Sequence, residues 1–78
     1  MNIVIYIKSN CPNCTTAKRL LDSKGIGYTE FDVGTPDGLL SLQANVSAQY
    51  RQMPQIFILG QRVGGLAGLQ AALKEMEI

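Results

Sequence analysis

The tetrad Cys11-Pro12-Asn13-Cys14 joins a short apolar run, Ile3–Ile7, to an amphipathic helical pattern, and it contains both cysteines of the chain. This junction predicts a strand that leads into a helix, with Cys11 at the helix N-terminus. Unpaired backbone N–H groups and the positive end of the helix dipole stabilise a thiolate at that position. Cys14 follows three residues later on the same helical face, so the pair can alternate between dithiol and disulfide. We therefore expect thiol–disulfide chemistry, with Cys11 as the nucleophile and Cys14 as its partner.

A cysteine pair with this spacing could instead belong to a metal site or form a structural cross-link. Zinc in proteins prefers four ligands, but the chain contains no His and no second cysteine pair. A disulfide across two intervening residues closes a loop too small to stabilise the fold much, because the entropic gain grows with loop length. The cysteines are therefore predicted to be redox-active, and no metal ligands are predicted.

Length and charge narrow the class of protein further. At 78 residues the chain is expected to form a single domain over residues 1–78. Its 7 Lys and Arg residues nearly balance its 6 Asp and Glu residues. No basic run with interleaved aromatic residues is present, so nucleic acid is not an expected partner. The apolar run Ile3–Ile7 ends at Lys8 and is too short for a signal peptide or a membrane span. These features predict a cytoplasmic protein that does not interact with membranes.

Hydrophobic periodicity predicts seven elements in the order βαβαββα. Strands are expected at 3–7, 28–33, 55–59 and 61–63, and helices at 12–24, 35–50 and 66–76. Gly25 ends the first helix, and Thr35-Pro36 begins the second as N-cap and first-turn proline. The second helix would extend through Val46 to about Tyr50, and its weak point is Gly38. A turn around Gly60 makes the last two strands a hairpin.

Three motifs in order along the chain point to a family. Ile5-Tyr6-Ile7-Lys8 precedes the cysteine tetrad, Met53-Pro54-Gln55-Ile56-Phe57-Ile58 follows in the second half, and Val63-Gly64-Gly65 comes last. With these motifs the chain resembles the glutaredoxins over nearly its whole length. The resemblance implies a thioredoxin-like α/β fold, in which a four-stranded mixed sheet is flanked by three helices. It also implies a cis peptide before Pro54, beside the active site.

The same resemblance implies an activity and a ligand. The activity is that of a monomeric dithiol oxidoreductase, which reduces protein disulfides and glutathione mixed disulfides with glutathione as co-substrate and no tightly bound cofactor. Glutathione would lie in a groove between Cys11, the Met53-Pro54 turn and the start of the last helix. The residues expected to contact it are Lys8, Asn13, Gln52, Met53, Pro54, Gly65, Leu66 and Ala67.

Some of these positions are also consistent with an ordinary structural role. Lys8 could be a solvated lysine at the end of a strand, or it could favour the thiolate and bind the glycyl carboxylate of glutathione. Pro54 could simply begin an edge strand. Gln52 and its neighbour Arg51 could be exposed polar residues without a role.

Departures from the family pattern leave the electron source open. Many glutaredoxins carry an aromatic residue where this chain has Asn13, and acidic residues where it has Leu66-Ala67-Gly68. The run from Tyr50 to Pro54 also resembles redoxins that serve ribonucleotide reductase and are recharged by thioredoxin reductase. A redoxin recharged in that way is therefore the alternative, and ribonucleotide reductase is a candidate partner in either case.

A third alternative belongs to a different class of protein. Two subunits could share a metal ion or an iron–sulfur cluster through Cys11. Pro12 argues against this alternative, because cluster binders of the family usually lack proline at that position.

Overall fold

The computed structural model describes residues 2–45 and 52–76 of the chain. Its elements follow the predicted order: β1 (Ile3–Ile7), α1 (Pro12–Ser23), β2 (Thr29–Asp32), α2 (Pro36–Asn45), β3 (Gln55–Ile58), β4 (Gln61–Gly64) and α3 (Leu66–Glu75). Apart from the end of α2, every end either agrees with the predicted one or differs from it by a single residue. The predicted continuation of α2 through Val46 to Tyr50 lies outside the described residues. Within the described ranges, no helix is both long and apolar enough to cross a bilayer.

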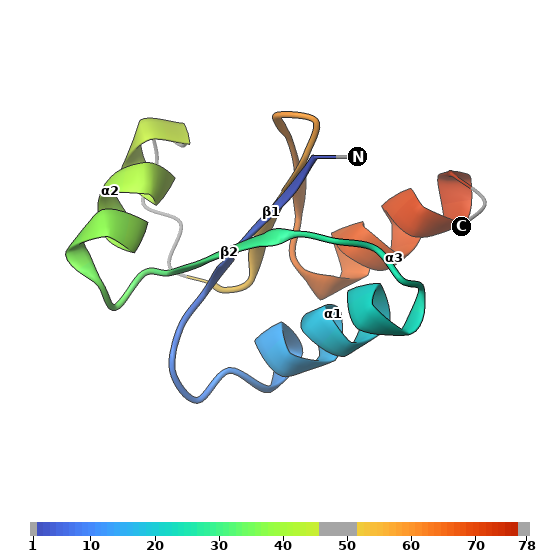
Figure 1. Ribbon diagram of the computed structural model, residues 1–78, viewed down its shortest axis with the longest axis horizontal. Coiled ribbons are helices and arrows are strands. Elements are labelled where there is room, and N and C mark those ends of the chain that lie inside the picture. Colours follow the sequence, from blue (N-terminus) through green and yellow to red (C-terminus); the bar gives the residue numbers. More distant parts are fainter. Residues whose placement is uncertain (1, 46–51, 77–78) are drawn as a thin grey trace.

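The strands form one mixed sheet in the order β2-β1-β3-β4, which Figure 1 shows from the side, between α2 and the pair α1 and α3. β1 is parallel to β2 and antiparallel to β3, and β3 is antiparallel to β4. The predicted four-stranded mixed sheet with three helices is thus confirmed. β1 lies inside the sheet, as its continuous apolar sequence indicates, because both of its faces must be covered.

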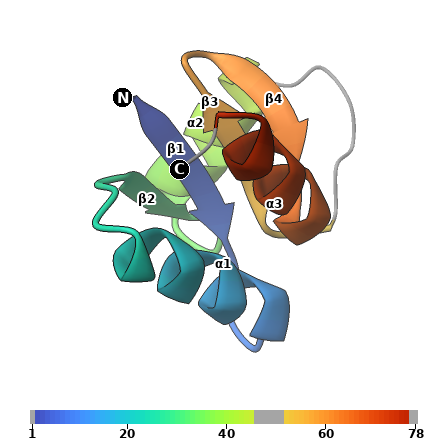
Figure 2. The ribbon, with the colours of Figure 1, turned by 90° about the vertical axis from the view of Figure 1, so that its right-hand side faces the viewer.

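Helices cover the two faces of the sheet unequally. Figure 2 shows α1 and α3 on one face and α2 on the other. Alternate strand residues point to opposite faces, so each face has its own core cluster. The cluster beneath α1 and α3 consists of Ile3, Ile5, Ala17, Leu21, Ile56, Ile58, Leu69 and Leu73.

Tyr6 organises the second core cluster, on the face covered by α2. Its ring stacks on Phe31 at a centroid distance of 5.5 Å and meets the edge of Phe57 at 5.7 Å. Its hydroxyl group shares a hydrogen bond of 2.8 Å with Ser41 of α2. A buried tyrosine with a satisfied hydroxyl adds both apolar contact and orientation, so this residue fixes α2 against the sheet.

The start of α2 explains a glycine that helix propensity does not favour. Thr35 caps the helix as predicted: its hydroxyl accepts a hydrogen bond from the backbone N–H of Gly38 (3.1 Å) and donates one to the carbonyl of Asp32 (2.7 Å). Gly38 is buried, and a Cβ atom there would overlap the carbonyl oxygen of Asp32 at the end of β2. Gly38 therefore permits a close approach of α2 to β2, which the sequence pattern did not reveal.

The hairpin between β3 and β4 has a two-residue turn. Leu59 (φ 53°) and Gly60 (φ 81°) both adopt the left-handed conformation, as in the type I′ turns that join twisted antiparallel strands. This turn places Arg62 opposite Phe57, and a register shift follows between Ile56 and Phe57. The hairpin thus sets which residues of β4 lie beside the start of β3.

We predict that Gly38→Ala destabilises the fold, although alanine is the better helix former by about 1 kcal/mol. The added Cβ must displace the Asp32 carbonyl, and such overpacking costs about 1–3 kcal/mol. Urea unfolding followed by circular dichroism measures the change. Gly27→Ala is the matched control, because a Cβ at Gly27 meets nothing within 4 Å. If the Gly38→Ala variant is at least as stable as the wild type, the close approach of α2 to β2 is contradicted.

Candidate active site

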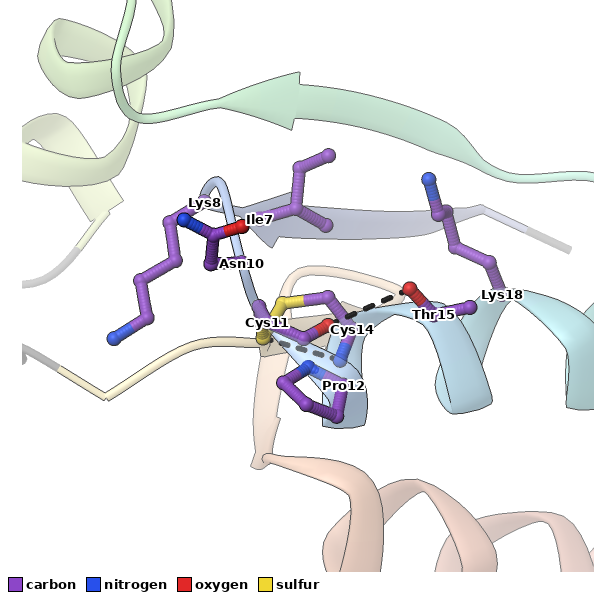
Figure 3. A pocket seen from close by; sticks show the side chains of 8 residues that line it. All are labelled: Ile7, Lys8, Asn10, Cys11, Pro12, Cys14, Thr15 and Lys18. Atoms are coloured by element: carbon purple, nitrogen blue, oxygen red, sulfur yellow. Dashed lines mark hydrogen bonds between the residues drawn. A yellow bond between two sulfur atoms is a disulfide. The ribbon is translucent and has the colours of Figure 1, made fainter.

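The two cysteines lie where β1 passes into α1 and form a disulfide (Figure 3). Cys11 is the N-cap of α1, with extended backbone angles (φ −120°, ψ 94°), and Pro12 occupies the first turn. Cys14 follows within that turn, at a Cα–Cα distance of 5.2 Å from Cys11. The predicted position of the pair at the strand-to-helix junction is therefore confirmed.

Two backbone groups contact the sulfur of Cys11. The N–H of Cys14 donates a hydrogen bond to it at 3.1 Å, and the carbonyl oxygen of Met53 lies 3.4 Å away. After reduction, the N–H group and the helix dipole favour the thiolate, whereas the carbonyl can accept a hydrogen bond from the neutral thiol. The carbonyl thus limits the stabilisation of the thiolate that the helix terminus provides.

The two cysteine residues differ in exposure to solvent. Cys11 is 9% exposed and Cys14 is 3% exposed, and both belong to the core cluster around Tyr6. A nucleophile must reach its substrate, so the more exposed Cys11 is the better candidate for the first attack. Cys14 is placed to react with a sulfur that Cys11 has already bound.

The peptide bond between Met53 and Pro54 is cis, as the resemblance implied. Pro54 directly precedes β3, which lies between β1 and β4, so it does not begin an edge strand. Because β3 pairs with β1, the turn before β3 comes next to the loop after β1. This pairing brings Met53 to Cys11 from 42 residues away along the chain.

A groove of about 310 Å³ runs from this turn to the start of α3. It contains every residue predicted to contact glutathione except Lys8. The lining residues are Asn13, Gln52, Met53, Pro54, Gln55, Arg62, Gly65, Leu66 and Ala67. Gly65 is the N-cap of α3 and supplies no side-chain cap, so the first backbone N–H groups of that helix are available to an anionic ligand.

Lys8 lines a separate cavity of about 440 Å³, together with Asn10, Thr15, Lys18 and both cysteines. The two cavities have no lining residue in common. In Figure 3, Lys8 and Lys18 extend on either side of the disulfide. The structure therefore places Lys8 near Cys11 but does not bring it to the groove.

Lys18 has a carboxylate partner on the sheet. Its Nζ lies 2.9 Å from a carboxylate oxygen of Glu30. The hydrogen bond to Glu30 raises the pKa of Lys18 above its ordinary value of 10.5, although some desolvation opposes the shift. Lys18 therefore stays protonated at neutral pH and contributes positive charge to the cavity beside the disulfide.

The sequence interpretation did not assign a role to two residues of the groove, Gln55 and Arg62. The sequence did contain a signal for these two residues. A two-residue hairpin turn pairs Arg62 with Phe57, and Phe57 lies on the same face of the sheet as Gln55, two residues earlier on the same strand. Arg62 Nε in fact donates a hydrogen bond to Gln55 Oε1 at 2.8 Å. In the part of the chain that the structure describes, no three His, Cys, Asp or Glu side chains are grouped so that they could hold a metal ion.

Comparison with known proteins agrees with this geometry. A family model described as Glutaredoxin matches residues 3–63. Glutaredoxin 3 of Escherichia coli K12 is 38% identical over 72 residues, which cover 90% of this chain and 83% of that protein. The structure of reduced Escherichia coli glutaredoxin matches with a TM-score of 0.76 at 29% identity, and the match covers 100% of both chains. A hybrid peroxiredoxin of Haemophilus influenzae is 38% identical over 69 residues, which are 88% of this chain but only 28% of that protein.

We predict that iodoacetamide alkylates Cys11 before Cys14 in the reduced protein. The pH midpoint of the reaction should lie below about 8.5, the ordinary value for a cysteine thiol, because the helix terminus and the Cys14 N–H favour the thiolate. Lys8→Ala should raise this midpoint by a few tenths of a pH unit, as expected for a solvent-screened charge. Peptide mapping by mass spectrometry after timed alkylation measures both effects.

Lys74→Ala is the control for that substitution, since Lys74 is an exposed lysine in the last turn of α3. Equal midpoints in the Lys8→Ala variant, the control and the wild type would show that Lys8 is an ordinary surface lysine. Alkylation of Cys14 before Cys11 would contradict the assignment of Cys11 as the nucleophile.

Proposed function

Because the chain belongs to the glutaredoxin family of thiol–disulfide oxidoreductases, we propose that it reduces protein disulfides and glutathione mixed disulfides with glutathione as the electron donor. Cys11 is the nucleophile and Cys14 the resolving cysteine. The observation that carries this proposal is the position of Cys11 at the α1 N-terminus, where the residue is more exposed than Cys14 and its sulfur lies 3.1 Å from the Cys14 N–H. The proposed setting is the cytoplasm, and no tightly bound cofactor is required.

The first step is attack by the Cys11 thiolate on one sulfur of a substrate disulfide. The substrate S–S bond breaks as the bond to Cys11 forms, and the other substrate sulfur leaves as a thiolate that takes up a proton. The helix terminus contributes mainly to the later steps, because a stabilised Cys11 thiolate is a good leaving group from a mixed disulfide.

Two routes complete the reaction. In the dithiol route, Cys14 attacks the Cys11 sulfur and releases the second substrate thiol, which leaves the enzyme with the Cys11–Cys14 disulfide. Two glutathione molecules then reduce this disulfide and become glutathione disulfide. In the monothiol route, Cys11 carries the glutathionyl group from the substrate, and a second glutathione removes it as glutathione disulfide. The dithiol route transfers two electrons from two glutathione molecules to the substrate disulfide, whereas the monothiol route consumes one glutathione, which takes the place of the protein thiol in the disulfide.

The groove supports glutathione as the ligand. It runs from Met53 and Pro54, next to the Cys11 sulfur, to the backbone N–H groups at the start of α3. Met53 lines the groove beside the cis peptide, where its backbone would pair with an extended peptide as a neighbouring strand does. The helix terminus suits a carboxylate of that peptide.

A second candidate function has one observation in its favour. No side-chain carboxylate stands at Leu66 or Ala67, where the groove meets α3, so an ammonium group of the ligand has no acidic partner there. A redoxin recharged by thioredoxin reductase needs no such partner. Under either candidate, the disulfide of ribonucleotide reductase is one substrate of the proposed class. The redoxin-like run that suggests it includes Tyr50 and Arg51, which lie outside the described residues.

We predict that Cys11→Ser abolishes both reactions, whereas Cys14→Ser loses reduction of an intramolecular peptide disulfide but keeps removal of glutathione from a mixed disulfide. External glutathione can complete only the monothiol route. Chromatography of the two peptide products measures the reactions separately. Turnover of either peptide by Cys11→Ser would refute the proposed roles of the two cysteines.

A coupled assay tests the electron source. With a disulfide peptide as the electron acceptor, we expect the wild type to support rapid NADPH oxidation with glutathione and glutathione reductase, and little with thioredoxin reductase alone. Cys14→Ser serves as a control, because thioredoxin reductase has no enzyme disulfide to reduce in that variant. Rapid turnover with thioredoxin reductase alone, together with none in the glutathione system, would replace the proposed function by the redoxin alternative.

A further inference from the structure

Gln55, at the start of β3, connects β4 to the turn before β3 through both ends of its side-chain amide. Its Oε1 accepts a hydrogen bond from Arg62 Nε at 2.8 Å, and its Nε2 donates one to the carbonyl of Gln52 at 2.7 Å. Gln55 is 3% exposed and is the one polar residue among the buried residues that the structure describes. Burial protects these hydrogen bonds from competition with water. Gln55 therefore holds the turn before β3 and the Arg62 guanidinium in one arrangement.

Arg62 brings positive charge to the groove. Among the described residues that line it, Arg62 is the only one with a charged side chain. Gln55 uses the donor at Nε, and the fork of donors in a guanidinium is planar and rigid, so a bond at Nε fixes the orientation of the whole group. The charge thus stands at a defined place on the groove wall, near the N-terminus of α3.

We infer that Arg62 determines ligand specificity by binding a carboxylate of the peptide in this groove, with Gln55 as the positioning residue that holds it there. The inference rests on the proposed function, because it identifies the group that recognises the ligand of the same site. No acidic side chain is among the described lining residues, so the groove favours carboxylates over ammonium groups. Glutathione carries two carboxylates and one ammonium group, and the carboxylates are the part this groove is built to bind.

A purely structural role for Arg62 would be to tie β4 to the start of β3. The two roles differ in what they change. Loss of a structural bond lowers stability without a dependence on the charge of the ligand. Loss of a binding charge raises the KM for an anionic ligand, leaves kcat unchanged, and matters less at high salt.

The test compares Arg62→Gln and Arg62→Lys with the wild type. Arg19→Gln is the matched control, because it removes an exposed arginine of α1 that does not line the groove. Two measurements are made at low and high salt: kinetics with a glutathione mixed-disulfide peptide, and NMR titration of the reduced protein with S-methylglutathione, which cannot react. A third measurement repeats the titration with a form of S-methylglutathione in which the glycyl carboxylate is an ethyl ester.

We expect Arg62→Gln to raise both the KM and the dissociation constant about two- to fivefold at low salt, the size of a partly exposed ion pair. The effect should shrink at high salt, Arg62→Lys should restore part of the affinity, and Arg19→Gln should behave as the wild type. If the ester binds the wild type as weakly as it binds Arg62→Gln, the glycyl carboxylate is the partner. If the ester still binds the wild type more tightly than it binds Arg62→Gln, the glutamyl carboxylate is the partner of Arg62.

Gln55→Met tests the positioning role. It should raise the KM in the same direction as Arg62→Gln, and the double variant should add little, since both changes disrupt one hydrogen-bonded unit. Additive effects would overturn the positioning role of Gln55. If Gln55→Met does not fold, the Arg62 variants still decide whether Arg62 binds the ligand.

The outcomes separate this inference from the proposed function. A wild type that reduces the mixed disulfide while Arg62→Gln matches it in KM and binding overturns the inference and keeps the function. If the wild type is inactive with glutathione but binds S-methylglutathione more tightly than Arg62→Gln does, the inference is kept and the proposed function is overturned. If the wild type does not bind the probe, the inference is overturned, and the coupled assay with the two reductases decides the function separately.

Discussion

The contact between the Cys11 sulfur and two opposed backbone groups is the constraint on which the site depends. The Cys14 N–H belongs to α1, and the Met53 carbonyl belongs to the turn before β3. The first group favours the thiolate and the second can hold the neutral thiol, so the sulfur lies between two competing influences. The contact with Met53 does not form unless β1 and β3 pair and thereby bring the two segments together. The sheet therefore sets the reactivity of the cysteine as well as its position.

The same arrangement makes the cysteines part of the core. Both belong to the cluster formed by Tyr6, Leu42, Met53 and Phe57, and not to the larger cluster beneath α1 and α3. Cys14 is the more deeply buried of the two. In the proposed reaction a substrate disulfide would therefore meet Cys11 first, so the proposed order of the two cysteines agrees with their packing. The close approach of α2 to β2, which Gly38 permits, helps to close this face of the sheet.

The groove next to the Met53–Pro54 turn has no acidic side chain among its described lining residues, so the proposed selection of a peptide would depend on other groups. Under the proposed function, backbone groups at Met53 and at the start of α3 would bind a peptide without regard to its side chains. Arg62, held by Gln55, adds positive charge to the groove, and in our inference this charge discriminates between a carboxylate and an ammonium group. Lys8 lines a different cavity and would act on the thiolate or on a protein substrate more directly than on a ligand in the groove.

The sequence by itself determined the order of the elements, the position of the redox pair, and most of the groove. Periodicity, caps and turn residues are local, so the seven elements, the Thr35 cap and the Gly60 turn could be predicted from neighbouring residues. The family motifs then predicted the cis peptide at Pro54 and the residues at the start of α3. Three features required the tertiary structure: the need for glycine at residue 38, the separation of Lys8 from the groove, and the Arg62–Gln55–Gln52 connection. Each depends on how closely two elements pack or on the register of the hairpin. The two-residue hairpin turn could indicate from the sequence that Arg62 and Gln55 share a face of the sheet, but the hydrogen bonds and close approaches themselves follow from packing the whole chain.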